Sequence, residues 1–180
     1  MKQLLITTHL YTFAVICVIA TTISSCTFKK KTDMETLTGT KENELTMLVG
    51  TYTSGDSKGI YSFRFNEETG TATALSETEV ENPSYLAVSA DGKFIYTVSE
   101  FNNEQAAANA FAFNQEKGTL KLLNSQKTGG EDPCYIITNG NNVITANYSG
   151  GSISVFPIAK DGSLLPASDI IKFEGSGTDK

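Results

Sequence analysis

Short runs of alternating apolar and polar residues fill the chain from Met47 onward, and each run is bounded by residues that favour turns. The clearest run is 59–66, where aromatic side chains occupy every second position from Tyr61 to Phe65. A period of two is that of a β-strand. Further strands are predicted at 47–52, 85–89, 94–98 and 143–147. The pattern therefore predicts an all-β protein.

Turn signals separate these runs. The pair Asp91-Gly92 lies between two apolar alternating segments and is the strongest hairpin signal in the chain. Residues 66–70 and 139–142 are predicted to form turns as well. The alanine run 106–108 lies among asparagines, and we interpret it as part of a polar loop with one helical turn at most.

The strands recur at nearly regular intervals of 44 to 50 positions. Residues 82–85 (Asn-Pro-Ser-Tyr) return fifty positions later as 132–135 (Asp-Pro-Cys-Tyr), and Phe63 returns as Phe111 and then as Phe156. Periods of 40 to 50 residues built from short strands are typical of four-stranded propeller blades. The sequence therefore predicts about three blades over 47–180. Because the repeat is still running at its end, we expect the natural protein to be longer.

Residues 1–26 are predicted to be a targeting segment and not part of the fold. Lys2 precedes an uncharged, largely apolar stretch, 4–23, and the segment ends in Ile-Ser-Ser-Cys at 23–26. This ending resembles a bacterial lipobox, whose cysteine is lipidated and becomes the first residue of the mature protein. The alternative is an uncleaved transmembrane helix, since about twenty residues can just span a bilayer.

The polar composition of 27–46 predicts a flexible linker between this segment and the domain. A lipid on Cys26 would anchor the chain to a membrane while the folded part stays in water. The expected location is the cell envelope, in the periplasm or at the outer membrane of a Gram-negative bacterium.

Charge and composition exclude several classes of function. From Met47 onward, nine Lys and Arg residues stand against sixteen Asp and Glu, a net charge of −7, so nucleic acid is not an expected partner. His9, the only histidine, falls in the targeting segment, which excludes histidine-based triads and histidine-ligated zinc in the remaining residues. No acidic run has the spacing of a calcium loop, so no metal is expected. Cys134 is interpreted as a small buried residue.

Glu100 is the candidate catalytic residue. Residues 97–100 match 145–148 at a spacing of 48, which predicts that Glu100 and the pair Asn147-Tyr148 share one layer at the end of an inner strand, near the channel mouth. There a carboxylate could act as a general base on water, while an amide and a phenol donate hydrogen bonds to a developing oxyanion.

Tyr52 matches the same layer in the first repeat and is a further candidate for substrate binding. Two alternatives stay open at this point. Glu100 could be a solvated loop carboxylate, and Asn147 could form an Asx-type turn that shapes the corner at 149–151.

Several motifs together identify a family. They are Leu-Val-Gly-Thr-Tyr-Thr at 48–53, the Asn-Pro-Ser-Tyr segment with the Leu-Ala-Val that follows it, Asp-Gly-Lys at 91–93, and Asn-Tyr-Ser-Gly-Gly-Ser-Ile-Ser-Val-Phe-Pro-Ile at 147–158. Over 47–180 the chain resembles the lactonase family of seven-bladed propellers, which contains propeller-type 6-phosphogluconolactonases and fungal carboxymuconate cyclases. The resemblance implies a ring of seven blades with a ligand site at the channel mouth, and hydrolysis of a sugar-acid lactone without a cofactor.

The family's Pro-His-x-His segment and its arginines come after the point where this sequence ends, so no residue here carries them. Tyr135 stands where relatives often have histidine. The leading hypothesis is a lactone hydrolase acting on a small molecule, although an exported protein would not meet the sugar phosphates of central metabolism. The alternatives are a lipid-anchored propeller that binds a sugar acid or a partner protein, and a lactonising cyclase.

Overall fold

The computed structural model describes residues 43–175. The predicted targeting segment 1–26, with its lipidation candidate Cys26, lies outside the described residues, as does the predicted linker up to residue 42. Among the described residues, no helix is long and apolar enough to cross a membrane.

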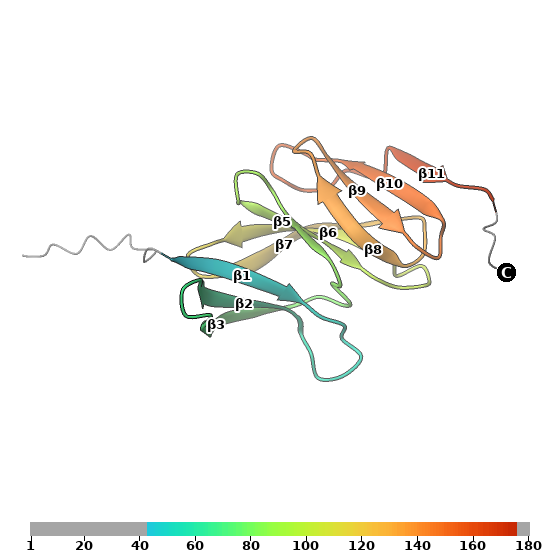
Figure 1. Ribbon diagram of the computed structural model, residues 1–180. Helices are drawn as coiled ribbons and strands as arrows, with labels where there is room; N and C mark the ends of the chain where they lie inside the picture. The colour runs from blue at the N-terminus through green and yellow to red at the C-terminus, as the bar shows by residue number, and fades with distance from the viewer. Residues whose placement is uncertain (1–42, 176–180) are drawn as a thin grey trace, which may run out of the picture. The chain divides into compact units, whose positions relative to one another are not determined.

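Eleven β-strands make up the described part of the chain and form three antiparallel sheets (Figure 1). The first sheet contains β1 (Glu44–Gly50), β2 (Gly59–Asn66) and β3 (Ala72–Glu79). The second contains β4 (Leu86–Val88), β5 (Phe94–Ser99), β6 (Ala107–Asn114) and β7 (Thr119–Lys127). The third contains β8 (Pro133–Thr138), β9 (Asn142–Asn147), β10 (Ser152–Pro157) and β11 (Asp169–Lys172). The all-β prediction is confirmed.

Strand order defines an inner and an outer edge. Within each sheet the strands follow one another in sequence order, so the second runs β4-β5-β6-β7 and the third β8-β9-β10-β11. The first strands β4 and β8 lie in contact with each other, whereas on the other side β3 contacts β7. We therefore assign β4 and β8 to the inner edge of the propeller.

The first sheet has three strands among the described residues, whereas the second and third have the four strands predicted for a blade. Its β1 occupies the place that β5 and β9 hold in the other sheets, and it is an edge strand with no neighbour on its inner side among the described residues. A cleft of about 670 Å³ runs beside it, lined in part by apolar side chains. These are Leu45, Leu48, Leu86, Val88 and Phe113.

Two further boundaries differ from the sequence prediction. β1 begins at Glu44, so the last residues of the predicted linker belong to the sheet, because Leu45 extends the alternating pattern and pairs with Phe65. The alanine run is not a polar loop with a helical turn. Ala107 and Ala108 begin β6 and are buried, since small side chains let this strand pack closely against its neighbours.

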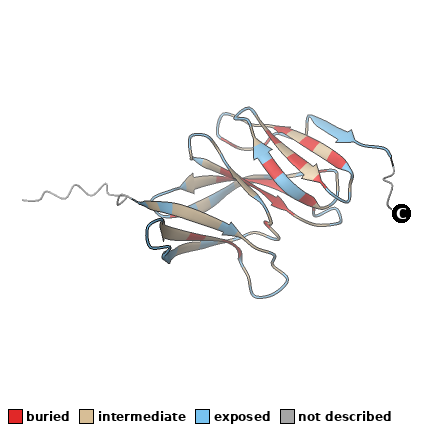
Figure 2. Ribbon diagram, in the orientation of Figure 1, coloured by how far each residue is buried: buried red, intermediate tan, exposed pale blue. Residues whose placement is uncertain are grey.

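Apolar side chains fill the space between adjacent sheets. Figure 2 marks the buried residues in red, and many of them lie in strands of the second and third sheets. Between the second and third sheets, Tyr96 and Val98 of β5 meet Ile136, Phe156 and Leu164. A smaller cluster between the first and second sheets is formed by Ile60, Ile95 and Phe111. This burial is the main force that holds the sheets together.

Polar contacts fix how the sheets are aligned. The side chain of Asn124 donates to the carbonyl of Leu164 at 2.7 Å and accepts from its N–H at 2.9 Å. Between the first and second sheets, the hydroxyl of Ser76 donates to the carbonyl of Gly118 at 2.7 Å. Because such bonds are directional, they specify one alignment that apolar packing alone would leave open.

Candidate functional site

Tyr52, Glu100 and Tyr148 follow β1, β5 and β9 at equal intervals along the chain. The backbone N–H of Glu100 donates to the carbonyl of Asn82 at 3.0 Å, and the N–H of Tyr148 donates to the carbonyl of Asp132 at 2.8 Å. The structure therefore places Glu100 and Tyr148 at equivalent positions, as the repeat predicted.

The strands that precede Glu100 and Tyr148 are not the inner strands that the sequence predicted. Glu100 and Tyr148 follow β5 and β9, which are the second strands of their sheets, and not the inner strands β4 and β8. The inner strand is the first of its sheet here: β4, which was predicted as 85–89, spans three residues, and the longer β5 follows it.

The carboxylate of Glu100 receives two hydroxyl donors on one oxygen. The phenol of Tyr52 donates to Oε2 at 2.9 Å, and the hydroxyl of Ser84 donates to the same atom. No described residue donates to Oε1. One oxygen of the carboxylate is thus held in place, while the other has no donor among the described residues.

This contact changes the acidity of Tyr52. The hydrogen bond to Glu100 raises the pKa of the Tyr52 phenol, and partial burial and the negative charge of Glu100 act in the same direction. A phenol that donates to a carboxylate is stabilised in its protonated form. Tyr52 therefore stays a proton donor over the physiological pH range.

The structure does not bring Asn147 to this site. Its side chain is buried, and the amide nitrogen donates to Ser152 at 3.0 Å and to Ser154 at 2.8 Å, while its oxygen accepts from Thr145 at 3.0 Å. The amide is committed to bonds within the third sheet. Asn147 thus belongs to the framework, and it supports the corner through its bonds to serines and not through an Asx-type turn.

Tyr148 is brought to the equivalent position but not into contact with the Tyr52–Glu100 pair. Its side chain is 82% exposed and forms no hydrogen bond with the described residues. A role in binding substrate stays a prediction for this residue.

Ser84, Tyr85 and Tyr135 were missed as site residues. The rings of Tyr85 and Tyr135 lie 4.8 Å apart at an angle of 54°, and both are partly exposed. Tyr85 immediately precedes β4 and Tyr135 lies in β8, so the pair belongs to the inner edge. The repeat that relates 82–85 to 132–135 was the available signal, because it makes the two tyrosines equivalent.

Cys134 is exposed, which corrects its interpretation as a buried residue. The register of β8 against β9 shifts between Pro133 and Tyr135, and this irregularity turns the cysteine outward. Its sulfur lies 3.9 Å from the carbonyl oxygen of Ala146.

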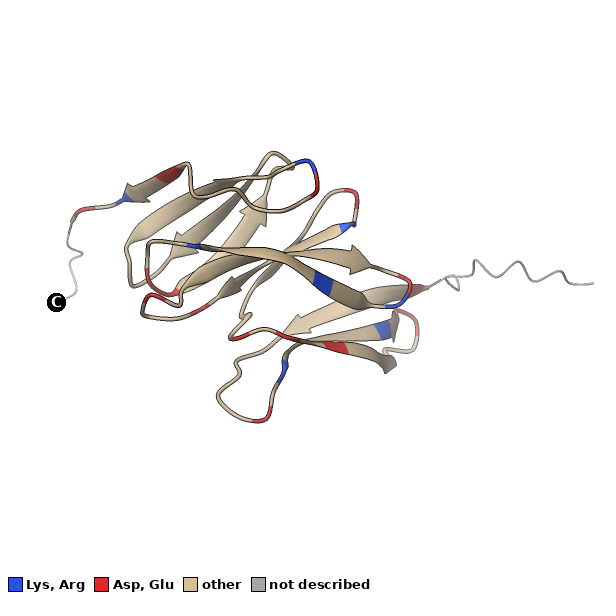
Figure 3. Ribbon diagram, turned by 180° about the vertical axis from the view of Figure 1, so that it is seen from behind, with Lys and Arg blue, Asp and Glu red and all other residues tan. Residues whose placement is uncertain are grey.

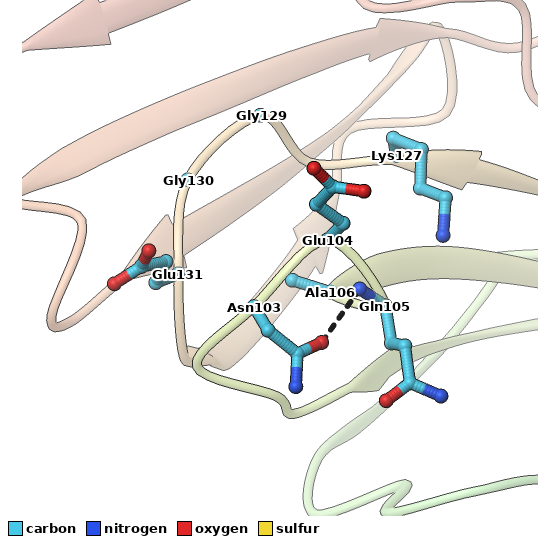
Figure 4. Close-up of a pocket in the computed structure, with 8 residues that line it drawn as sticks. All are labelled: Asn103, Glu104, Gln105, Ala106, Lys127, Gly129, Gly130 and Glu131. Atoms are coloured by element: carbon cyan, nitrogen blue, oxygen red, sulfur yellow. Dashed lines mark hydrogen bonds between the residues drawn. The ribbon is translucent and has the colours of Figure 1, made fainter.

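A separate cleft of about 630 Å³ lies between the β5–β6 and β7–β8 loops (Figure 4). It is lined by Glu104, Lys127 and Glu131 together with backbone at 129–130. The two carboxylates point in different directions in Figure 4, so they do not converge on a ligand. We therefore assign the candidate site to the Tyr52–Glu100 pair, where the polar groups do converge.

The charges around the described part of the chain are scattered. Figure 3 shows acidic residues mainly in loops and turns, with lysines spread among them. Over residues 43–175, no group of three or more His, Cys, Asp and Glu side chains is placed to hold a metal ion. The described residues of the candidate site offer hydroxyls, a carboxylate and aromatic rings.

Three antiparallel sheets in succession, with a polar cluster beside their inner strands, define a β-propeller. A family model for lactonases, described as seven-bladed β-propellers, matches residues 46–180, and the chain belongs to this family.

Similar proteins with solved structures agree. A Bacteroides fragilis protein described as a candidate 6-phosphogluconolactonase is 70% identical, with a TM-score of 0.77 over 79% of this chain and 40% of its own. The periplasmic gluconolactonase of Pseudomonas aeruginosa is 31% identical, with a TM-score of 0.65 over 71% of this chain and 38% of its own.

Among curated proteins, the 6-phosphogluconolactonase of Bacillus subtilis strain 168 is 38% identical over 122 residues, which is 64% of this chain and 34% of the relative. The chain thus spans about a third of the length of this relative, and well under half of either solved structure.

Proposed function

We propose that the full-length protein hydrolyses a sugar-acid lactone at the inner end of these sheets. The observation that carries the proposal is the Glu100 carboxylate, which is fixed on one oxygen by Tyr52 and Ser84 and open on the other. Relatives named 6-phosphogluconolactonase and gluconolactonase support the choice of reaction.

In this proposal Glu100 acts as a general base. Its free oxygen takes a proton from a water molecule while the water oxygen attacks the lactone carbonyl carbon. The resulting oxyanion needs hydrogen-bond donors, and the exposed phenol of Tyr148 is the predicted candidate among the described residues. Collapse of the intermediate breaks the ring C–O bond, and the departing ring oxygen takes the proton back from Glu100. The product is the open-chain sugar acid.

The aromatic pair Tyr85–Tyr135 offers a wall for the substrate. Both rings are partly exposed next to Ser84, which itself contacts Glu100. Ligand sites commonly combine aromatic surface with a few polar groups that fix orientation. We place the carbon skeleton of the lactone against this pair, so that its carbonyl can reach Glu100.

The test uses protein expressed from the complete gene. Hydrolysis of δ-gluconolactone and of 6-phosphogluconolactone is followed by acid release in a pH-stat for the wild type, Glu100→Gln and the matched control Glu104→Gln. Glu104 lies in the separate cleft, so its substitution should leave the rate unchanged. We expect Glu100→Gln to lower kcat/KM by about 10²- to 10⁴-fold.

A wild-type protein that hydrolyses neither lactone would favour the non-enzymatic alternative, in which the same face binds a sugar acid or a partner protein. Wild-type activity that survives in Glu100→Gln would instead remove Glu100 from the reaction.

We also propose that Cys26 carries a lipid that anchors the protein in the cell envelope. The supporting feature is the Ile-Ser-Ser-Cys ending at 23–26 after an apolar stretch. Labelling of cells with radioactive palmitate should mark the wild-type protein and not Cys26→Ser, and labelling of both variants would contradict the anchor at this residue.

A further inference from the structure

Asn82 holds an unusual backbone conformation at the junction of the first two sheets. Its φ is +44°, in the left-handed region, where asparagine is several-fold enriched among residues other than glycine. It comes directly before buried Pro83, between β3 and the inner strand β4. The hydrogen bonds of Asn82 in this conformation extend to two other segments of the chain.

On one side, Asn82 binds the segment that carries Tyr52. The side-chain oxygen of Asn82 accepts from the backbone N–H of Thr53 at 3.0 Å and from the hydroxyl of Thr53 at 3.0 Å. The backbone N–H of Asn82 donates back to that hydroxyl at 3.3 Å. Three hydrogen bonds thus fix the residue next to Tyr52.

On the other side, Asn82 binds Glu100 itself. Its side-chain nitrogen donates to the backbone carbonyl of Glu100 at 3.2 Å, and its own carbonyl accepts from the N–H of Glu100 at 3.0 Å. Tyr52 and Glu100 follow strands of different sheets, so one amide connects two backbone segments that lie far apart in the sequence.

We propose that Asn82 is a positioning residue, which sets the distance between the Tyr52 phenol and the Glu100 carboxylate by hydrogen-bonding both backbone segments. The inference rests on the proposed function for its effect on rate, but its effect on the Tyr52–Glu100 contact does not depend on any reaction.

The third sheet shows what the amide adds. Asp132 occupies the equivalent position with a φ of +51° and accepts from Tyr148 through its backbone carbonyl in the same way. A carboxylate, however, has no N–H to donate, and the side chain of Asp132 makes no hydrogen bond with the described residues. The backbone hydrogen bond therefore recurs in the third sheet, but there the side chain does not connect two backbone segments.

The test compares Asn82→Gly with Asn139→Ala in protein expressed from the complete gene. Glycine tolerates the left-handed conformation, so Asn82→Gly removes the amide without forcing the backbone to change. Asn139 also accepts two backbone N–H groups in a turn, but it lies at the β8–β9 turn, and it controls for the loss of an asparagine that only shapes a loop.

The first readout is the pKa of Tyr52, followed by nuclear magnetic resonance of protein labelled at the tyrosine ζ carbon, with Tyr52→Phe to assign the signal. The titratable groups near Tyr52 are Glu100 and Cys134, and the hydrogen bond to Glu100 is the main cause of its raised pKa. We expect the pKa of Tyr52 to fall toward its ordinary value in Asn82→Gly and to stay unchanged in Asn139→Ala.

The second readout is lactone hydrolysis. A misplaced general base should lower kcat by about tenfold to a hundredfold with little change in KM, because the substrate wall is untouched. If Asn82→Gly leaves both the pKa of Tyr52 and kcat unchanged, the positioning role is wrong, even where Glu100→Gln abolishes hydrolysis. If the wild type hydrolyses no lactone but the pKa still falls, the positioning role stands and the proposed function fails.

Thr53→Val serves where Asn82→Gly does not fold. It removes the Thr53 hydroxyl, which is one donor to the Asn82 side chain and the acceptor of the Asn82 N–H, and it keeps asparagine at position 82. A smaller fall in the pKa of Tyr52 is expected, and an unchanged value in this folded variant would overturn the proposal.

Discussion

Two hydroxyl donors on one oxygen of Glu100 raise the question of what each of them does. Tyr52 and Ser84 both satisfy Oε2, and neither has a histidine to activate it among the described residues. A serine that is hydrogen-bonded to a carboxylate could act as a nucleophile or could only hold the carboxylate in place. The open Oε1 favours the second role, because water can reach the base without displacing either donor.

Substitution of Ser84 separates these roles. We expect Ser84→Ala to lower kcat/KM by no more than about tenfold, since Tyr52 still holds the carboxylate and a typical hydrogen bond contributes about 1 kcal/mol. Steady-state hydrolysis of δ-gluconolactone by the full-length protein measures the effect. A loss of about a thousandfold or more would make Ser84 the nucleophile and contradict Glu100 as a base acting on water.

The Tyr52 phenol gives a pH-dependent prediction. Because its pKa is raised in the folded protein, the protonated form is the one that folding stabilises. The contribution of this proton to folding stability is complete below the ordinary tyrosine pKa of about 10. It is lost as the pH rises through the higher pKa of the folded state. Glu100→Gln should lower the pKa of Tyr52 in an ultraviolet or nuclear magnetic resonance titration, and a value that stays raised would mean that burial and not the carboxylate is the cause.

At the scale of elements, the β4–β5 connection is a loop longer than the Asp-Gly pair that predicts it. The Asp91-Gly92 pair does join two strands, as predicted, but within a longer loop closed by the bond from Ser89 N–H to the carbonyl of Phe94 at 2.9 Å. Gly92 has a φ of +68°, a conformation that glycine adopts without strain. Asp91 completes the turn by accepting from the Ser89 hydroxyl at 2.7 Å and from the Lys93 N–H at 3.1 Å.

Asp91 therefore makes the turn sensitive to acid. The hydrogen bond from the Ser89 hydroxyl, followed by that from the Lys93 N–H, lowers the pKa of the Asp91 carboxyl. Its contribution to stability is present above the unfolded-state value of about 4 and is lost as the pH falls through the lower folded-state value. We expect Asp91→Ala to lower Tm at pH 7 and to match the wild type near pH 2, in calorimetric scans.

Asp56 provides the control for that prediction, because it lies in an exposed loop and its carboxylate makes no hydrogen bond with the described residues. Asp56→Ala should leave Tm unchanged at both pH values. A Tm difference for Asp91→Ala that persists unchanged at low pH would show that the loop loses something other than the carboxylate.

The sequence predicted the elements where local pattern and tertiary packing agree. The strands around Phe63, Phe111 and Phe156 follow from alternation, and Phe111 and Phe156 are buried in the clusters between the sheets. The alanine run at the start of β6 was missed because alanine has little strand propensity of its own, and only its neighbours require a small side chain there. Ser84 and Asn82 were missed because their partners lie 16 to 29 residues away, beyond any local pattern.

For the whole molecule, the apolar clusters between sheets carry most of the stability. Phe156 of β10 is fully buried between the second and third sheets, whereas Phe173 is 63% exposed. We expect Phe156→Ala to lower the free energy of unfolding by about 3–5 kcal/mol and Phe173→Ala to change it by less than about 0.5 kcal/mol. Urea unfolding of the full-length variants tests this. Equal effects would mean that Phe173 packs against parts of the protein beyond the described residues.

The repeated backbone bonds at Asn82 and Asp132 bear on how such a protein can diversify after duplication of its units. Every residue type has the backbone carbonyl, and every type except proline has the N–H, so the loop keeps its shape while its side chains change. One copy can then acquire a chemical role without cost to the others. For protein engineers, the third sheet is by the same logic a ready recipient, into which the Asn82 and Glu100 side chains could be grafted at positions 132 and 148.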